Sequence, residues 1–326
     1  MKKILIIRLS SIGDIVLTSP ILRCLKSQTN FQIHFLTKFK YLKLVQNNPN
    51  VDKVFSFKKK IDLKLIYDLK KEDYNLIVDL HCNLRTFYLK IFLNKKTYSL
   101  NKLNIKKWFF VKFKINLLPK QHIVDRYFYT LKDIISNDNN GLDFFIPKSS
   151  EIKIQSLPKI FHHGYIGLVI CANHNTKKMP LLKLVNICEK LNKPVILLGG
   201  KEDFSTGEII CKKIGNRIFN SCGKYDIYGS SSIIKNADWI ISNDTGLMHI
   251  SAAFKKKIIS VWGSTVPNFG MYPYLSGYKS KIIVNKISCQ PCSKIGFDKC
   301  PKKHFKCMNH NVEEIIKDIN YQESKI

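Results

Sequence analysis

The 326-residue sequence lacks any long hydrophobic run. No segment offers about 18 consecutive apolar residues free of charge, which excludes a membrane-spanning helix of ordinary length. Near the N-terminus, Arg8 and Asp14 interrupt the apolar run that begins at Ile4, so a signal peptide is not expected either. We therefore expect a protein of the cytoplasm.

Acidic residues are also scarce. Only 24 Asp and Glu stand against 54 Lys and Arg, which gives a formal net charge of +30. This balance favours an anionic partner such as nucleic acid, an acidic membrane surface or a phosphorylated substrate. An AT-rich coding sequence, with abundant Lys, Asn and Ile, would produce the same balance without any partner. No RNA- or DNA-binding motif is recognisable, so nucleic acid is not the partner we expect.

Short-period repeats, low-complexity tracts and the dinucleotide-binding pattern G-x-G-x-x-G are missing too. The last absence argues against a nicotinamide or flavin site. Ten cysteines are present, and in a reducing compartment we expect them to be thiols. Four of them lie in apolar stretches and are typical of small core residues, namely Cys24, Cys171, Cys188 and Cys211.

Short β-rich runs alternate with helical patterns in both halves of the chain. The expected strands are 3–8, 32–36, 53–57, 76–80, 165–171, 195–198, 239–241 and 258–261, and the expected helices include 14–25, 247–254 and 312–320. This alternation is typical of βαβ units and parallel sheets. A polar, proline-marked linker at 147–158 separates the halves. We expect an α/β protein of two Rossmann-like domains, residues 1–155 and 156–326; the last helix could return onto the first domain.

A first polar turn follows the first expected strand. Ser10, Ser11, Gly13 and Asp14 lie at the carboxyl end of that strand, where open α/β sheets bind ligands. Gly13 allows close backbone approach to a ligand. Asp14 is either a plain helix cap or a group that acts on the ligand.

A second polar turn follows the strand at 239–241. Asp244, Thr245 and Gly246 form the turn, and the helix after it begins with unpaired amides that suit a phosphate group. His249 lies one turn into this helix and is either a ligand-binding group or a structural one.

Three motifs in this order resemble the ADP-heptose:lipopolysaccharide heptosyltransferases of glycosyltransferase family nine. They are Ser10-Ser-Ile-Gly-Asp14, Asp244-Thr-Gly-Leu-Met-His249 and Val261-Trp-Gly-Ser-Thr265. The resemblance implies GT-B architecture, in which two Rossmann-like domains face each other across a cleft and close on substrate, here around 149–158. It also implies an inverting enzyme without cofactor or catalytic metal. Its donor would be a nucleotide sugar, ADP-heptose, and its acceptor a lipid A-core saccharide at the inner face of the cytoplasmic membrane.

The same resemblance implies roles for single residues. Asp14 would be the general base. Lys177, with Lys178 as its rival, would contact the donor phosphates, although Met179 stands where the family has Trp. The other donor-side residues would be Asp244, Thr245, Gly246, His249 and, for the ribose, Glu202 or Asp203; those on the acceptor side would be Ser10, Ser11, Gly13, His122 and Arg126. Arg85 and Arg23 are further candidates for acceptor anions.

Two segments stay open to more than one interpretation. Residues 102–114 mix aromatic residues with lysines, which suits an anionic membrane surface or lipid-linked acceptor, or an amphipathic element that buries its aromatics in the first domain. Cys289, Cys292, Cys300 and Cys307 are spaced to hold a structural zinc, or are reduced loop thiols or a redox-sensitive pair. The function too keeps alternatives: the same chemistry with another nucleotide sugar or envelope acceptor, or a catalytically silent relative.

Overall fold

A computed structural model describes residues 2–323 of the chain. The chain divides into two compact units. The first unit comprises the residues up to Leu103 together with Gln121–Phe145, and the second comprises Asn104–Lys120 together with the residues from Ile146 onward. Each unit is built around one parallel sheet. None of the helices described is long and apolar enough to span a membrane.

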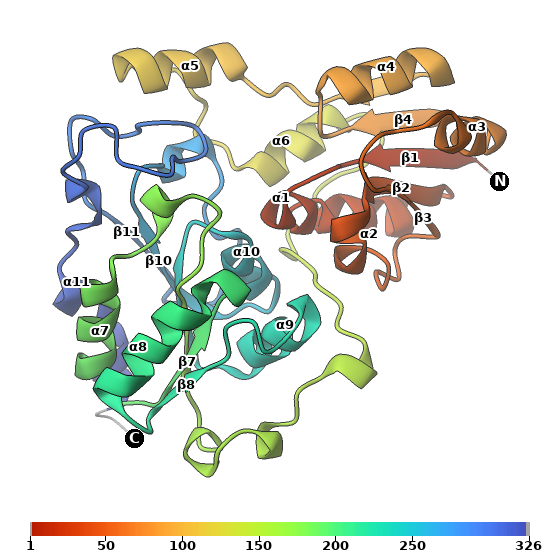
Figure 1. Ribbon diagram of the computed structural model, residues 1–326. Helices are drawn as coiled ribbons and strands as arrows, with labels where there is room; N and C mark the ends of the chain where they lie inside the picture. The colour runs from red at the N-terminus through yellow and green to blue at the C-terminus, as the bar shows by residue number, and fades with distance from the viewer. Residues whose placement is uncertain (1, 324–326) are drawn as a thin grey trace. The chain divides into compact units, whose positions relative to one another are not determined.

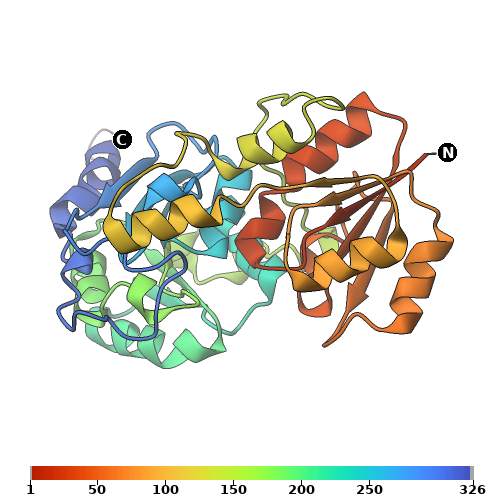
Figure 2. The ribbon, with the colours of Figure 1, turned by 90° about the horizontal axis from the view of Figure 1, so that it is seen from above.

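The first unit has a five-stranded sheet in the order β3-β2-β1-β4-β5, with every neighbouring pair parallel. Helices α2 and α6 cover one face of this sheet, and α3 and α4 cover the other (Figure 1, Figure 2). The strands are β1 (Lys3–Ile7), β2 (Gln32–Lys38), β3 (Lys53–Phe57), β4 (Leu76–Asp79) and β5 (Thr97–Ser99). The helices are α1 (Ile12–Val16), α2 (Ser19–Gln28), α3 (Leu63–Lys71), α4 (Leu84–Leu93) and α6 (Ile123–Thr130).

The second unit has a six-stranded parallel sheet in the order β11-β10-β9-β6-β7-β8. One face of it packs against α7, α8 and α11 in a single apolar cluster. The strands are β6 (Ile166–Val169), β7 (Val195–Leu198), β8 (Ile218–Asn220), β9 (Trp239–Asn243), β10 (Lys257–Trp262) and β11 (Lys281–Val284). The helices are α5 (Asn104–Phe113), α7 (Leu181–Lys190), α8 (Phe204–Ile214), α9 (Ile227–Asn236), α10 (Gly246–Ala253) and α11 (Val312–Glu323).

Both sheets reverse the direction of their strand order at one point. In the first sheet the switch lies between β1 and β4, and in the second it lies between β6 and β9. Loops that leave the carboxyl ends of the two central strands diverge there, and the crevice between them is where open α/β sheets bind ligands. The turns singled out in the sequence follow β1 and β9, so each of them lies at a switch point.

The structure corrects several predicted boundaries. The single helix expected over 14–25 is two helices, α1 and α2, because Pro20 in the first turn of α2 cannot continue a hydrogen-bonded helix from before it. The C-terminal helix does not return onto the first domain. It packs in the second unit, where Ile315 and Ile319 join the apolar cluster and Asn320 donates to the carbonyl of Lys190 at 2.9 Å.

The expected linker is bound to the second unit rather than lying between the two units. Ile152 donates its N–H to the hydroxyl of Ser232 at 2.8 Å, and Glu151 pairs with Lys235 at 2.9 Å, which fastens this stretch to α9. The units divide between Phe145 and Ile146 instead of after residue 155.

The basic, aromatic segment also differs from the expectation that it buries its aromatics in the first domain. Its helix α5 has no buried residue, and Trp108 and Phe113 are each about half exposed. It groups with the second unit, where Phe110 stacks edge-on against Phe269 and Lys114 donates to the carbonyl of Pro291 at 2.7 Å.

Candidate active site

The turn after β1 holds Asp14 in a dense polar network. Asp14 lies in the first turn of α1 and accepts hydrogen bonds from the Ser11 hydroxyl at 2.7 Å and the Ser11 backbone N–H at 3.0 Å. The guanidinium of Arg8 lies 2.5 Å from its other carboxylate oxygen. Asp14 is therefore both the third residue of a capping box, whose N-cap is Ser11, and a partly exposed carboxylate at the switch point, so the two interpretations of this residue are compatible.

Arg8 is itself fixed by the backbone around it. Its side chain is buried and donates to the carbonyls of Ser10 at 3.0 Å and of Leu80. Burial alone would lower the pKa of Arg8, but Asp14 and other neighbouring groups raise it above its ordinary value. A permanent positive charge thus lies directly behind the Asp14 carboxylate.

The loop after β4 lies at the other side of this switch point. Asp79 ends the strand and accepts hydrogen bonds from the backbone N–H groups of His81 at 2.9 Å and Cys82 at 2.8 Å. Burial, together with the charges of Arg8 and Lys102, lowers the pKa of His81 to about 4. His81 is therefore a neutral imidazole at pH 7, and the positive charge of Arg8 contributes to the lowering of its pKa.

The other residues proposed for the acceptor side have varied surroundings. Ser10 lies in the turn itself, Gly13 is buried in α1, and Arg85 is exposed at the start of α4. His122 is buried and caps α6 by accepting from the N–H of Val124, while Arg126 is buried and donates to the carbonyl of Asn101. Both of the latter hold α6 in place.

Arg23, also proposed for acceptor anions, is already neutralised. It pairs with Asp138 at 2.7 Å and with Asp143, and it donates to the carbonyl of Gly141. Two carboxylates on one guanidinium leave it little attraction for a further anion, so it clamps the loop before the end of the first unit.

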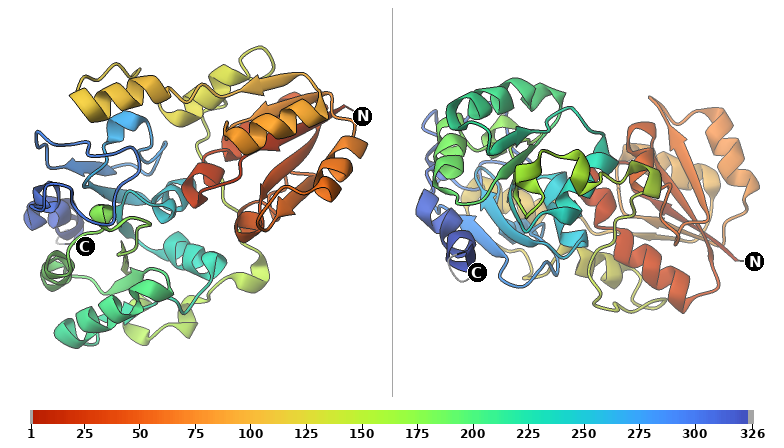
Figure 3. Two further views of the ribbon diagram at one scale, coloured as in Figure 1. Left: turned by 45° about the horizontal axis from the view of Figure 1, so that its top comes forward. Right: turned by 90° about the horizontal axis from the view of Figure 1, so that it is seen from below.

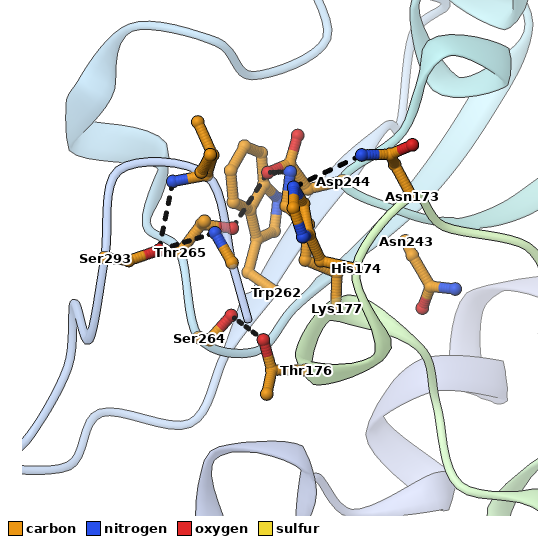
Figure 4. A network of polar contacts seen from close by, with 12 residues as sticks. Asn173, His174, Thr176, Lys177, Asn243, Asp244, Trp262, Ser264, Thr265 and Ser293 are labelled. Carbon is orange, nitrogen blue, oxygen red and sulfur yellow. Dashed lines mark hydrogen bonds and ion pairs between the residues drawn. The ribbon is translucent and has the colours of Figure 1, made fainter. Parts of the chain in front are cut away.

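The second switch point brings three side chains together from three parallel strands (Figure 4). Lys177 follows β6, Asp244 follows β9 and Thr265 follows β10, and the carboxyl ends of these strands share one edge of the sheet. The ammonium of Lys177 lies 2.5 Å from Asp244, and the Thr265 hydroxyl donates to the same carboxylate oxygen at 2.8 Å. All three side chains are mostly buried.

Hydrogen bonds to Thr176 fix the loop that carries Lys177. The hydroxyl of Thr176 accepts from Ser264 at 2.9 Å and from the N–H of Phe297 at 2.8 Å. Gly263 permits this approach, because a Cβ there would lie 2.8 Å from the Thr176 carbonyl oxygen. A cavity of about 340 Å³ adjoins this loop and is lined by Asn175, Thr176, Asp298, Lys299, Cys300, Lys303 and Phe305.

Helix α10 begins directly beside the Lys177 and Asp244 pair. Thr245 is its N-cap residue, and the Thr245 side chain makes no cap hydrogen bond to the first amides of α10, which start at Gly246. These amides and the positive end of the helix dipole suit an anion. His249 is 2% exposed, which favours a structural role for it in the core.

The structure distinguishes the members of two pairs of candidate residues. Lys177 and Lys178 are the candidates for the donor phosphates, and Glu202 and Asp203 are the candidates for the ribose. Lys178 pairs with Asp203 at 2.7 Å, whereas Lys177 pairs with Asp244. Asp203 is buried and also accepts from the N–H of Gly200, whereas Glu202 is exposed at the start of the same turn after β7. Both lysines are therefore paired with a carboxylate, but the partner of Lys177, Asp244, lies directly before α10. Of the two acidic residues, Glu202 is the exposed one.

The cysteine loop does not form the zinc site that its spacing allows. Between residues 2 and 323, no three His, Cys, Asp or Glu side chains are arranged to hold a metal ion. Cys292 instead donates to the carbonyl of Cys289, and Cys307 is buried beneath the loop. Burial and the neighbouring thiols raise the pKa of Cys292 to about 11 and that of Cys307 to about 12.

Sequence reasoning assigned no role to Arg8, His81 or Thr265. Each follows the carboxyl end of a strand next to a switch point. Strand order would have singled them out, but the order of parallel strands is not readable from one sequence.

Comparisons with known proteins identify the family and the fold. The family model of glycosyltransferase family 9 (heptosyltransferase) matches residues 63–303. Lipopolysaccharide heptosyltransferase 1 of Campylobacter coli is 25% identical over 313 residues, which cover 87% of this chain and 88% of that protein.

Two solved structures share the fold over nearly the whole chain. The glycosyl transferase family 9 protein from Veillonella parvula DSM 2008 has a TM-score of 0.77 at 18% identity and covers 98% of this chain and 96% of its own. The E. coli ADP-heptose lps heptosyltransferase II has a TM-score of 0.70 at 19% identity, with coverage of 98% and 100%. The predicted α/β fold with two Rossmann-like sheets is confirmed.

Proposed function

Because the chain belongs to glycosyltransferase family 9 and is an enzyme of the heptosyltransferase kind, we propose that it moves heptose from ADP-heptose to a lipid A-core acceptor with inversion at the anomeric carbon. The name of the E. coli structural relative supports this choice of donor. The observation that carries the proposal is the cluster of Lys177, Asp244 and Thr265 beside the start of α10 at the switch point of the second sheet.

This cluster fits the leaving group of the reaction. As the bond between the anomeric carbon and the diphosphate breaks, its electron pair moves onto the ADP and negative charge grows on the β-phosphate. Lys177 and the first amides of α10 would stabilise that charge. Asp244 would repel a diphosphate, so its role is to orient Lys177 and to accept hydrogen bonds from donor hydroxyls. Glu202 would accept from the ribose.

The first unit supplies the other half of the chemistry. Asp14 would take the proton of the acceptor hydroxyl as its oxygen attacks the anomeric carbon on the face opposite the diphosphate. Its hydrogen bonds to Ser11 and its ion pair with Arg8 fix the direction of the carboxylate. Attack from the opposite face gives inversion.

The test uses purified protein and its Asp14→Asn variant, each with ADP-heptose and a deep-rough lipopolysaccharide acceptor. ADP release and product mass are recorded, and donor affinity is measured by calorimetry. We expect the wild type to add one heptose and the variant to lose about 10²-fold or more in kcat, with unchanged donor affinity.

Two other results would change the proposal. If the wild type binds ADP-heptose but transfers it only to a different envelope saccharide, the acceptor assignment is wrong. If it binds and turns over a different nucleotide sugar, the donor assignment is wrong, and Met179 in place of the family Trp is the first residue to exchange.

A further inference from the structure

Helix α4 is apolar on two opposite sides. Leu89 and Leu93 are buried against the sheet of the first unit. Facing away from the sheet, five large apolar side chains recur every three or four residues, namely Leu84, Phe87, Tyr88, Ile91 and Phe92. Each of the five is 52–74% exposed. Surface helices normally present a polar outer side, and a contiguous apolar one marks an interaction site.

The neighbouring helix α3 extends this surface. It packs beside α4 on the same side of the sheet, with Leu65 and Leu69 inward, and it exposes Leu63 by 82% and Tyr67 by 59%. Figure 3 (left) shows α4, in orange, lying against one face of the sheet. We name these outward residues the α3–α4 face: Leu63, Tyr67, Leu84, Phe87, Tyr88, Ile91 and Phe92.

Basic residues outnumber acidic ones around the α3–α4 face. Between residues 58 and 96, which belong to the first unit, the sequence has ten Lys and Arg against five Asp and Glu. The exposed basic side chains include Arg85 and Lys96 at α4 and Lys64, Lys70 and Lys71 on α3. The carboxylates on or next to α3 are Asp62, Asp68, Glu72 and Asp73. A basic rim around an apolar centre is complementary to a surface that is anionic outside and apolar inside.

A second copy of this chain does not fit that description. It would bring the same lysines and a net charge of +30 to the contact, so the rims would repel each other. An anionic bilayer meets both demands, because Phe, Tyr, Leu and Ile side chains enter the boundary of headgroups and acyl chains while Lys and Arg pair with lipid phosphates.

We propose that the α3–α4 face docks the first unit on an anionic lipid bilayer. The proposal rests on the proposed function, since it brings the unit that carries Asp14 to the membrane in which a lipid-linked acceptor resides. The docking surface is distinct from the residues that act on the sugar.

The test measures co-flotation of the full-length protein with vesicles of phosphatidylglycerol and phosphatidylcholine, or of phosphatidylcholine alone. The variant is the double substitution Phe87→Gln, Phe92→Gln. The matched control is Leu182→Gln, Tyr278→Gln in the second unit, where both side chains are equally or more exposed, at 75% and 86%. Circular dichroism and the melting temperature check that both variants fold.

We expect the wild type and the control to bind anionic vesicles in a salt-dependent way, and the α4 variant to bind at least 10-fold more weakly. Wild-type binding by the α4 variant, or an equal loss in the control, overturns the proposal. A lipid-free wild type that is dimeric in light scattering and becomes monomeric on Phe87→Gln, Phe92→Gln would show that copies of the chain pair through this face, which also overturns it.

A transfer assay separates this proposal from the proposed function. On a deacylated, water-soluble acceptor the α4 variant should match the wild type, and on the intact acceptor in vesicles it should be slower. If the wild type transfers heptose to neither acceptor, the proposed function fails, while flotation still decides whether the α3–α4 face binds lipid.

Discussion

The guanidinium of Arg8 lies 2.5 Å from the carboxylate of Asp14, and Arg8 also donates to two carbonyls of the flanking loops. The arginine thus ties the proposed base to the ends of both β1 and β4. Its planar guanidinium donates in three directions, which the single ammonium of a lysine cannot reproduce.

Arg8→Lys should therefore lower kcat by roughly 10- to 100-fold, because the Asp14 carboxylate loses its fixed orientation. Steady-state kinetics with ADP-heptose measure the effect, and donor KM should change little. Arg23→Lys is the matched control, since Arg23 clamps Asp138 and Asp143 in the same unit. An equal fall of kcat in the control would mean that both variants act through the fold alone.

Adjacent lysines after β6 provide a sharper comparison. Lys177 pairs with Asp244, whereas Lys178 pairs with Asp203. Lys177→Ala should lower kcat by about 10²- to 10³-fold, the usual cost of one donor to a developing charge. Lys178→Ala removes the same charge from the next residue and should keep kcat within a few-fold of the wild type. The reverse order of effects would transfer the phosphate-binding role to Lys178.

Eight of the eleven strands described could be predicted from the sequence. The runs at 53–57 and 195–198 match β3 and β7 residue for residue, because β-branched and aromatic residues mark them clearly. The strands that were missed, β5, β8 and β11, have three or four residues and lie at sheet edges, where few apolar residues are needed. Their short runs do not stand out from loop sequence.

The candidate site could be predicted only in part from the sequence, because some of its residues come together only through the strand order. Asp14 and Asp244 were singled out in the sequence because each follows a strong strand in a turn with Gly. Arg8 and Thr265 became visible only once the strand order placed their loops beside those carboxylates. His122 and Arg126 were placed with the acceptor by motif, and their burial as supports of α6 could not be derived from spacing.

The Thr176 hydroxyl should matter for stability. It accepts from the N–H of Phe297 and from Ser264, and it donates to the carbonyl of Phe297 at 2.9 Å. Thr176→Val keeps the shape but leaves the Phe297 N–H and the buried Ser264 hydroxyl without this partner, which should lower the free energy of unfolding by about 1–3 kcal/mol. Urea denaturation measures this change in the free energy of unfolding. Thr130→Val, at a half-buried hydroxyl that bonds only within its own helix turn, should cost clearly less.

His81 should make the stability of the protein depend on pH. Its pKa is lowered from the ordinary 6.5 to about 4, mainly by burial, so the unfolded chain binds a proton that the folded chain rejects between these two values. This contribution to stability is complete above about pH 6.5 and is lost as the pH falls toward 4. His81→Gln removes the titrating group, so the variant should lose less stability on acidification than the wild type does.

Melting temperatures from pH 8 to pH 5 measure the difference, and His163→Gln, at an exposed histidine, should follow the wild-type curve. Parallel curves for wild type and His81→Gln would show that the imidazole of His81 is not protonated preferentially in the unfolded chain.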